Sequence, residues 1–120
     1  MKYMILIYGN EEKWSSLPQE ELAKLIAETD AHNKALFESG ELIGAYGVAD
    51  QDQAKRVHVR DGVPVVTDGP YIEAKEYLGS FSIVDCESLE RALEIAAAMP
   101  SARLTEIEVR PLLHEAGLEM

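Results

Sequence analysis

The sequence predicts a single α+β domain in which two strand–helix–strand units share one sheet and a β-hairpin is inserted between them. A chain of 120 residues with 47% apolar residues has the size and composition of one globular domain. Two segments carry apolar residues at helical spacing between strand-like runs, and an Asp-Gly dipeptide joins two further β-rich runs. This order of elements is typical of a ferredoxin-like split βαβ sheet with an added hairpin.

The first unit begins with residues 2–8, which are apolar at both odd and even positions. Both faces of this strand are therefore expected to be buried, as in a central strand. A helix is predicted over 17–39, because Ser16 and Gln19 have the spacing of a capping box and Gly40 stands where a C-terminal glycine stop belongs. The helical stripe expected to face the sheet comprises Leu22, Leu25, Ile26, Thr29, Asn33, Leu36 and Phe37.

Turn and cap residues delimit the remaining elements. Asp61-Gly62 is a strong hairpin-turn dipeptide, and Ser88 is a typical N-cap residue. The expected elements are, in chain order, a strand at 42–48, hairpin strands at 53–60 and 63–67, a strand at 77–85, a helix at 89–99 and a strand at 104–110.

The two helices of this arrangement can cover only one face of the sheet. Because the first strand is apolar on both faces, the second face also needs a cover. In a chain of this length the simplest cover is the sheet of a second copy. Burial of apolar surface contributes about 25 cal/mol per Å², so the sequence predicts a stable homodimer.

The charge balance limits the classes of partner. The chain carries 22 acidic and 11 basic residues, a net charge of −11, and its pI is about 4.6. Such a surface repels phosphate backbones and anionic lipid headgroups, so neither nucleic acid nor a membrane is an expected partner. The apolar run Met4–Tyr8 is too short for a signal-peptide core, and a cytoplasmic location is expected.

No metal site or cofactor is expected. A lone cysteine, Cys86, excludes an internal disulfide, and His32, His58 and His114 lack the short spacings of zinc ligands. The sequence contains no glycine-rich phosphate loop, nucleophile elbow or dinucleotide-binding fingerprint.

Three stretches in the second half of the chain form a recognisable motif. They are Val59-Arg60-Asp61-Gly62, Val66-Thr67-Asp68-Gly69-Pro70-Tyr71 and Leu78-Gly79-Ser80-Phe81. Together they resemble the DGPF signature of the YCII-related family, with Tyr71 in place of the Phe of that signature. The resemblance covers about residues 1–112 and leaves 113–120 as a C-terminal tail. It implies a ferredoxin-like domain that pairs into a dimeric α+β barrel.

The resemblance implies little about the reaction. The YCII-related group is mostly uncharacterised, a His–Asp pair has been proposed as catalytic in some members, and some relatives resemble enzymes of chlorinated aromatic breakdown. DGPF members also tend to be encoded near extracytoplasmic-function sigma factors. These associations allow either an enzyme or an accessory protein.

Asp68 and His32 are the candidate catalytic residues. Asp68 lies where a strand ends before Gly69, so its carboxylate can act as a general base at a pocket mouth or bond its own turn. His32 lies at the edge of the helical stripe, half-buried toward the sheet, where a neutral imidazole beside a carboxylate suits proton transfer. A packing or solvated histidine is the alternative.

Five further residues are candidates for ligand binding. Gly69, Pro70 and Tyr71 follow Asp68 in the motif, Lys75 can neutralise an anionic ligand, and Tyr8 can line a cavity. The alternatives are a solvated charge run around Lys75 and a core position for Tyr8.

Two functions remain open at the level of the sequence. The first is a cofactor-free enzyme that moves a proton on a small aromatic or lactone-like molecule, with Asp68 and His32 as its acid–base groups. The second is a non-enzymatic ligand-binding or accessory module, linked to sigma-factor regulation through a protein partner. The two differ in whether Asp68 faces a cavity that holds a second titratable group.

Overall fold

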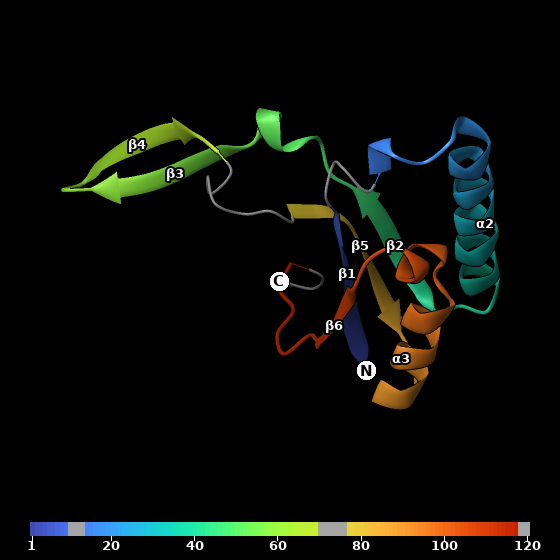
Figure 1. Ribbon diagram of the computed structural model, residues 1–120. Helices are drawn as coiled ribbons and strands as arrows, with labels where there is room; N and C mark the ends of the chain where they lie inside the picture. The colour runs from blue at the N-terminus through green and yellow to red at the C-terminus, as the bar shows by residue number, and fades with distance from the viewer. Residues whose placement is uncertain (10–13, 70–76, 118–120) are drawn as a thin grey trace.

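Helices α2 and α3 and a four-stranded antiparallel sheet form the body, from which a two-stranded hairpin projects (Figure 1). The computed structural model describes residues 1–9, 14–69 and 77–117. The elements are β1 (Lys2–Gly9), α2 (Gln19–Glu38), β2 (Leu42–Gly47), the 3₁₀-helix η1 (Gln51–Gln53), β3 (Lys55–Arg60), β4 (Val63–Asp68), β5 (Tyr77–Asp85), α3 (Leu89–Ala98), the 3₁₀-helix η2 (Pro100–Arg103) and β6 (Ile107–Pro111).

The sheet has the strand order β2-β5-β1-β6, so β1 is a central strand, as its two apolar faces predict. Both helices lie on one face of this sheet (Figure 1). The core forms between them, and its most buried large side chains are Ile5, Val84 and Ile95. The predicted α+β, ferredoxin-like fold is therefore confirmed.

The structure confirms two of the predicted helix ends and corrects a third. Gly40 follows α2 with a φ of +82°, and the Ser88 hydroxyl accepts a hydrogen bond from Arg91 N at the start of α3. The capping box at Ser16 is wrong, because α2 begins at Gln19 with Pro18 at its N-cap and no side-chain cap. A separate turn, closed from Leu17 N to Trp14 O, keeps Ser16 outside the helix.

Two other predicted features differ in the structure. Ile26 and Phe37 do not face the sheet, since they are 55% and 73% exposed. Only the arc of α2 that contains the buried Leu36 packs inward, which is narrower than the predicted stripe. The last strand begins at Ile107 rather than 104, because η2 and the turn that follows it occupy the preceding residues.

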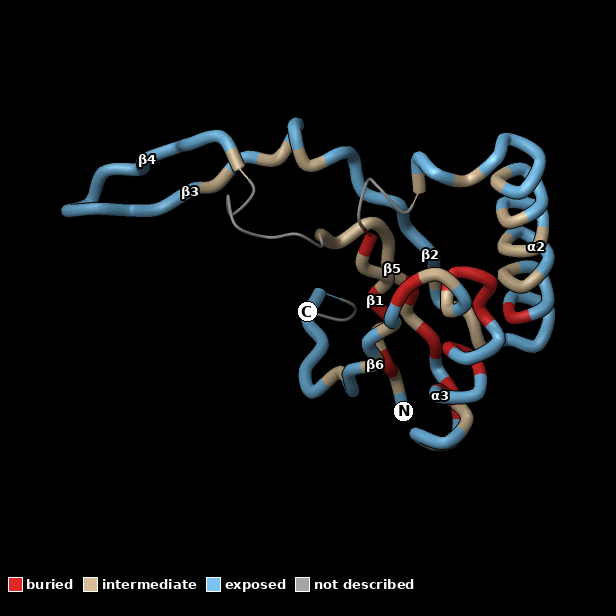
Figure 2. The backbone as a smooth tube through the Cα atoms, in the orientation of Figure 1, coloured by how far each residue is buried: buried red, intermediate tan, exposed pale blue. Residues whose placement is uncertain are grey.

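The other face of the sheet, here called the open face, is covered by neither α2 nor α3 (Figure 2). It is apolar over β1, β5 and β2, while β6 adds Arg110 beside Met4 and Glu108 beside Leu6. The pairing registers place Met4 beside Ile83 and Leu6 beside Phe81 on this face. Tyr46 pairs with Phe81, its ring centroid lies 5.2 Å from that of Phe81, and it remains 51% exposed. The feature that predicts a second copy is thus present, while the homodimer itself stays a prediction.

The hairpin of β3 and β4 forms a sheet of its own. Asp61 and Gly62 at its turn have φ values of 51° and 76°, the left-handed conformations of a type I′ turn. The radius of gyration is 16.6 Å, larger than the roughly 14 Å of a compact domain of this length. The projecting hairpin accounts for this difference (Figure 1).

Among the described residues, no helix has both the length and the apolar character needed to cross a membrane.

A bidentate ion pair ties the start of β2 to α3. Arg91 donates from Nε and Nη2 to the carboxylate of Glu41, with both distances 2.8 Å. These hydrogen bonds lower the pKa of Glu41 from 4.5 to about 2, with a further contribution from the Ser39 hydroxyl. The carboxylate therefore stabilises the fold as an anion.

We predict that Glu41→Gln lowers the Tm at pH 7 by several degrees. We also expect the Tm of this variant to fall less than that of wild type as the pH decreases from 4.5. A depressed native pKa contributes stability that is present above pH 4.5 and is lost as the pH falls toward 2. Thermal unfolding between pH 2.5 and 7 measures this contribution. Glu94→Gln, which removes the exposed i,i+3 partner of Arg91, is the control and should leave the acid profile unchanged. Identical profiles for Glu41→Gln and wild type would contradict the prediction.

Candidate functional site

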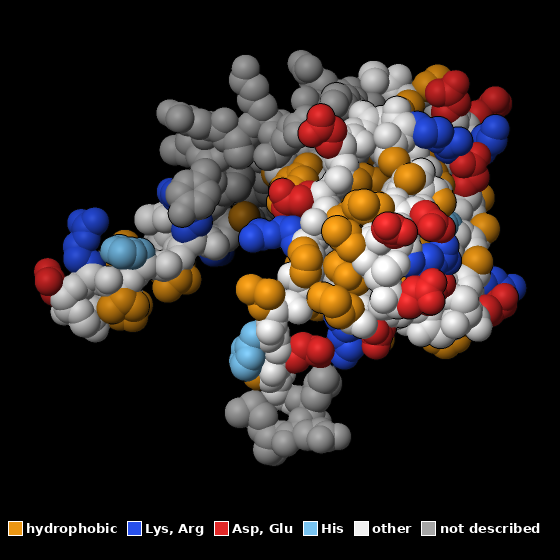
Figure 3. All heavy atoms as spheres, turned by 90° about the horizontal axis from the view of Figure 1, so that it is seen from below, with side chains coloured by type: hydrophobic (Ala, Val, Ile, Leu, Met, Phe, Trp, Pro, Cys, Tyr) orange, Lys and Arg blue, Asp and Glu red, His pale blue; other side chains and the backbone are white. Residues whose placement is uncertain are grey.

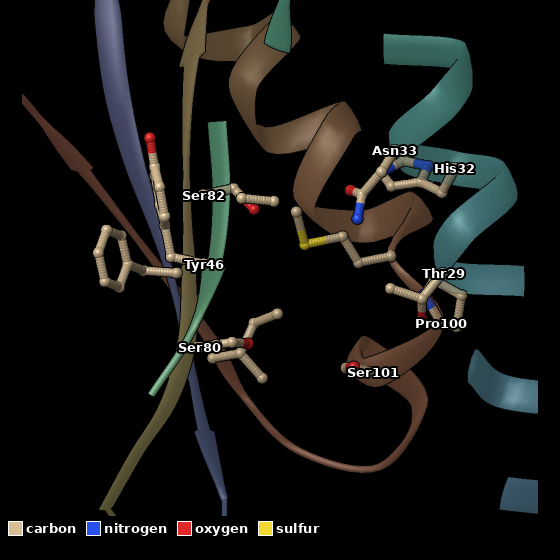
Figure 4. Close-up of a pocket in the computed structure, with 13 residues that line it drawn as sticks. Thr29, His32, Asn33, Tyr46, Ser80, Ser82, Pro100 and Ser101 are labelled. Carbon is tan, nitrogen blue, oxygen red and sulfur yellow. The ribbon is translucent and has the colours of Figure 1, made fainter. Parts of the chain in front are cut away.

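A cavity of about 230 Å³ lies between the sheet and the helices (Figure 4). Its helical wall is formed by α2, its opposite wall by β1, β2 and β5, and its floor by the segment from α3 to η2. The side chains that carry its polar groups are Thr29, His32, Asn33, Ser80, Ser82 and Ser101.

Polar groups face each other across this cavity. Ser80 and Ser82 alternate along β5 and so point to the same face of the sheet, opposite His32 and Asn33 on α2 (Figure 4). Ser82 and Ser101 are only 4% and 8% exposed. Buried hydroxyl groups on the sheet wall and on the floor can orient the oxygen atoms of a small ligand.

His32 supplies the titratable group of the cavity. Its Nε2 atom is buried and has no hydrogen-bond partner among the described residues. Burial lowers the pKa of His32 below its usual 6.5; the nearby Ile95 backbone opposes the shift and the positive charge of Arg91 adds to it. The imidazole is therefore neutral at pH 7, and a neutral imidazole can accept a proton.

The volume of the cavity sets the size of its ligand. An apolar cavity of about 150 Å³ is enough to hold benzene. A cavity of about 230 Å³ therefore has room for one substituted six-membered ring. Ile7, Met99 and Pro100 supply apolar contacts for such a ring, and the hydroxyl groups supply polar ones.

Asp68 lies elsewhere, at the end of β4 on the projecting hairpin. Its side chain is 85% exposed and forms an ion pair with Lys55 on the paired strand. The neighbouring Gly69 donates its N–H to Ala54 O at 2.8 Å, which closes the base of the hairpin. Within one chain, the structure does not bring Asp68 and Gly69 into the cavity of His32.

Tyr8 also lies outside the cavity. Its hydroxyl donates to Glu108 Oε1 at 3.4 Å, beside the open face. Burial, followed by the charge of Glu108, raises the pKa of Tyr8 above its usual value. The remaining predicted ligand-binding residues, Pro70, Tyr71 and Lys75, lie outside the described residues.

Most of the polar lining of the cavity is not among the site residues predicted from the sequence. Thr29 and Asn33 stand in the predicted apolar stripe of α2, and this polar interruption was the available signal. Ser80 and Ser82 give a similar signal, since they alternate within an otherwise apolar strand. No comparable pattern marks Ser101, which reaches the cavity through the turn after α3.

Groups of three or more His, Cys, Asp or Glu side chains that could bind a metal ion are absent from residues 1–9, 14–69 and 77–117.

We predict that His32 titrates below pH 6.5 and that its protonation destabilises the fold. Because the native pKa is lowered, the unfolded chain binds a proton first, and stability falls as the pH decreases through 6.5. Imidazole NMR signals followed from pH 8 to 5 give the pKa directly. His32→Gln should flatten the stability profile over this range, while the exposed His58→Gln serves as the control. A His32 midpoint at or above 6.5 would refute the prediction.

Comparison with known proteins places the chain in a family and defines its fold. An uncharacterised protein of Rhizobium meliloti (strain 1021) is 32% identical over 114 residues, which cover 93% of this chain and 92% of the relative. A solved structure of 5-chloro-2-hydroxyhydroquinone dehydrochlorinase from Burkholderia phenoliruptrix AC1100, in complex with 2,5-dihydroxybenzoquinone, has a similar fold. It matches with a TM-score of 0.56 and 15% identity over 96% of each chain. The model of the YCII-related domain matches residues 1–115, and the chain therefore belongs to this family.

Proposed function

We propose that this protein is a cofactor-free enzyme that binds a hydroxylated six-membered ring, or a lactone of similar size, in the cavity beside His32. The proposed reaction is a proton-coupled elimination or isomerisation. The observation that carries the proposal is the neutral, buried Nε2 atom of His32 at a cavity of single-ring size, which has no hydrogen-bond partner in the described part of the chain.

The lining of the cavity supports this class of ligand. Hydroxyl groups of Ser80 and Ser82 on one wall and the Asn33 amide on the other suit ring oxygens. The dehydrochlorinase with a similar fold was solved with a benzoquinone, which is a ligand of the same size. That likeness is one of fold, and the cavity of this chain carries the proposal.

The proposed elimination balances without an oxidant or a reductant. His32 Nε2 accepts the proton of a ring hydroxyl, and the O–H electron pair moves to form a carbonyl group. The shifting ring double bond takes up that proton at the carbon that bears the leaving group, and this carbon becomes tetrahedral. His32 Nε2 then accepts the proton of a second ring hydroxyl, a second carbonyl group forms, one ring double bond shifts, and the leaving group departs from the tetrahedral carbon with its bonding electrons. One proton and one anion are lost in total, and the imidazolium later releases its proton to water.

Asp68 retains a proposed role only through a second copy. Its position on the projecting hairpin separates it from the cavity of its own chain. A catalytic contribution from Asp68 would therefore depend on the homodimer that the open face supports. We propose this homodimer as well, with the open faces of two copies in contact.

A non-enzymatic binding module is the second candidate function. The exposed ion pair of Asp68 with Lys55 favours it, because the carboxylate bonds its own hairpin. His32 also lacks a second titratable group facing the cavity among the described lining residues, since Tyr46 lies on the other side of the sheet (Figure 4). Such a module would bind a ligand without turnover and act through a protein partner such as a sigma factor.

We predict that wild-type protein binds 2,5-dihydroxybenzoquinone and releases chloride from chlorinated hydroxyhydroquinones. His32→Gln should retain binding and lose chloride release by about 100-fold or more, as for removal of a general base. Isothermal calorimetry measures binding, and a chloride electrode measures turnover. His58→Gln, on the hairpin, should behave as wild type.

Four results would change this assignment. Binding without turnover in wild type supports the binding module, and equal turnover in His32→Gln and wild type removes His32 from the mechanism. Absence of binding by any single-ring probe rejects the cavity as the site. If Asp68→Asn loses turnover while His32→Gln retains it, the acid–base role lies on the hairpin instead.

A further inference from the structure

The projecting hairpin has two chemically different faces. The cross-strand pairs Val57–Val66 and Val59–Pro64 place three valines and a proline on one face, here called the valine face. The opposite face carries Arg56, His58 and Arg60 together with their cross-strand partners Thr67, Val65 and Val63. Toward the tip of the hairpin, Figure 3 shows hydrophobic side chains gathered on one side and basic and His side chains on the other. The Lys55–Asp68 pair lies on the valine face at the base of the hairpin.

The valine face is not packed against the body of its own chain. Val57, Val59 and Val66 are 67%, 59% and 61% exposed. The exposure extends along β4 and along β3 beyond Arg56 (Figure 2). An isolated two-stranded hairpin is marginally stable in water, and exposed apolar strands with free edges favour association. These properties indicate that the valine face is covered in the assembled protein.

Two observations favour a second copy of this chain as the cover. The hairpin leaves the body on the side of the sheet opposite the helices, the same side as the open face (Figure 1). Residues 54–69 carry three Lys or Arg residues against two Asp residues, a net charge of +1, which leaves −12 on the rest of the chain. The hairpin is therefore attracted to the acidic body of another copy, and this attraction offsets part of the charge repulsion between two bodies that meet at their open faces.

We infer that the β3–β4 hairpin is an arm that packs its valine face against a second copy of this chain. This inference rests on the proposed homodimer and adds a contact to it beyond the open face. In a two-fold symmetric pair, each copy gives one arm and receives one, so the contact is made twice. The opposite face of the arm, with Arg56, His58 and Arg60, then supplies positive charge near the acidic partner.

The test compares matched substitutions on the two faces of the arm. Val57→Thr/Val59→Thr/Val66→Thr keeps β-branched residues in the strands and removes apolar contact from the valine face. Val63→Thr/Val65→Thr makes the same chemical change on the opposite face, where the valines are 61% and 41% exposed. Sedimentation velocity over a range of concentrations gives the dimer dissociation constant of each variant.

We expect the valine-face variant to raise the dimer dissociation constant by about tenfold or more, because each buried threonine would desolvate a hydroxyl group. The control variant should stay within about twofold of wild type, the change expected for exposed sites. A valine-face variant that dimerises as wild type does, or a control that is equally impaired, overturns the inference. Wild-type protein that is monomeric at all concentrations overturns both the arm and the homodimer, and leaves the cavity to be judged by ligand binding.

A second measurement does not depend on the stability of the threonine variants. A nitroxide attached to Arg60→Cys, close to the tip of the arm, is mixed with ¹⁵N-labelled wild-type protein. Broadening of amide signals in the labelled wild-type copy is expected if the arm lies on its partner. Wild-type protein treated with the same reagent controls for labelling at the buried Cys86. An unbroadened spectrum in a sample shown to be dimeric overturns the inference.

Discussion

The two-sided burial of β1 is the constraint on which the rest of the structure depends. Tyr3 and Ile5 face the helices and enter the core, while Met4 and Leu6 face the other way. A strand of this kind must lie in the middle of a sheet with a cover on each side. Right-handed crossover connections place both helices of a split βαβ unit on one side. The opposite side is therefore the surface for which a single chain has no helix.

The cavity beside His32 results from incomplete filling of the space between α2 and the sheet. Small polar residues, Thr29, Ser80 and Ser82, stand where large apolar ones would close the core. A buried imidazole nitrogen that has no hydrogen-bond partner among the described residues reduces stability, because burial removes it from bulk water. Departures of this kind from ideal packing are typical of functional sites.

The arm and the body differ in net charge. The body has a net charge of −12, whereas the arm carries a net positive charge and an apolar face. Exposed valines on a free hairpin are an aggregation hazard unless a specific partner covers them. Short alternating strands and an Asp61-Gly62 turn hold the valine face in one register, which makes its contact specific.

The sequence by itself determined the order of the elements, the central position of β1, the type I′ turn and the Ser88 cap, because these follow from periodicity and local backbone preferences. It also indicated that His32 is half-buried at the edge of a helical stripe. Only the tertiary structure showed that His32 shares a cavity with Ser80, Ser82 and Ser101, and that Asp68 lies apart from it on the arm. Proximity between residues distant in the chain depends on how helices pack on the sheet and where a hairpin projects. Local sequence patterns determine neither the packing of the helices nor the direction of the hairpin, because the same residue spacing is compatible with many packings.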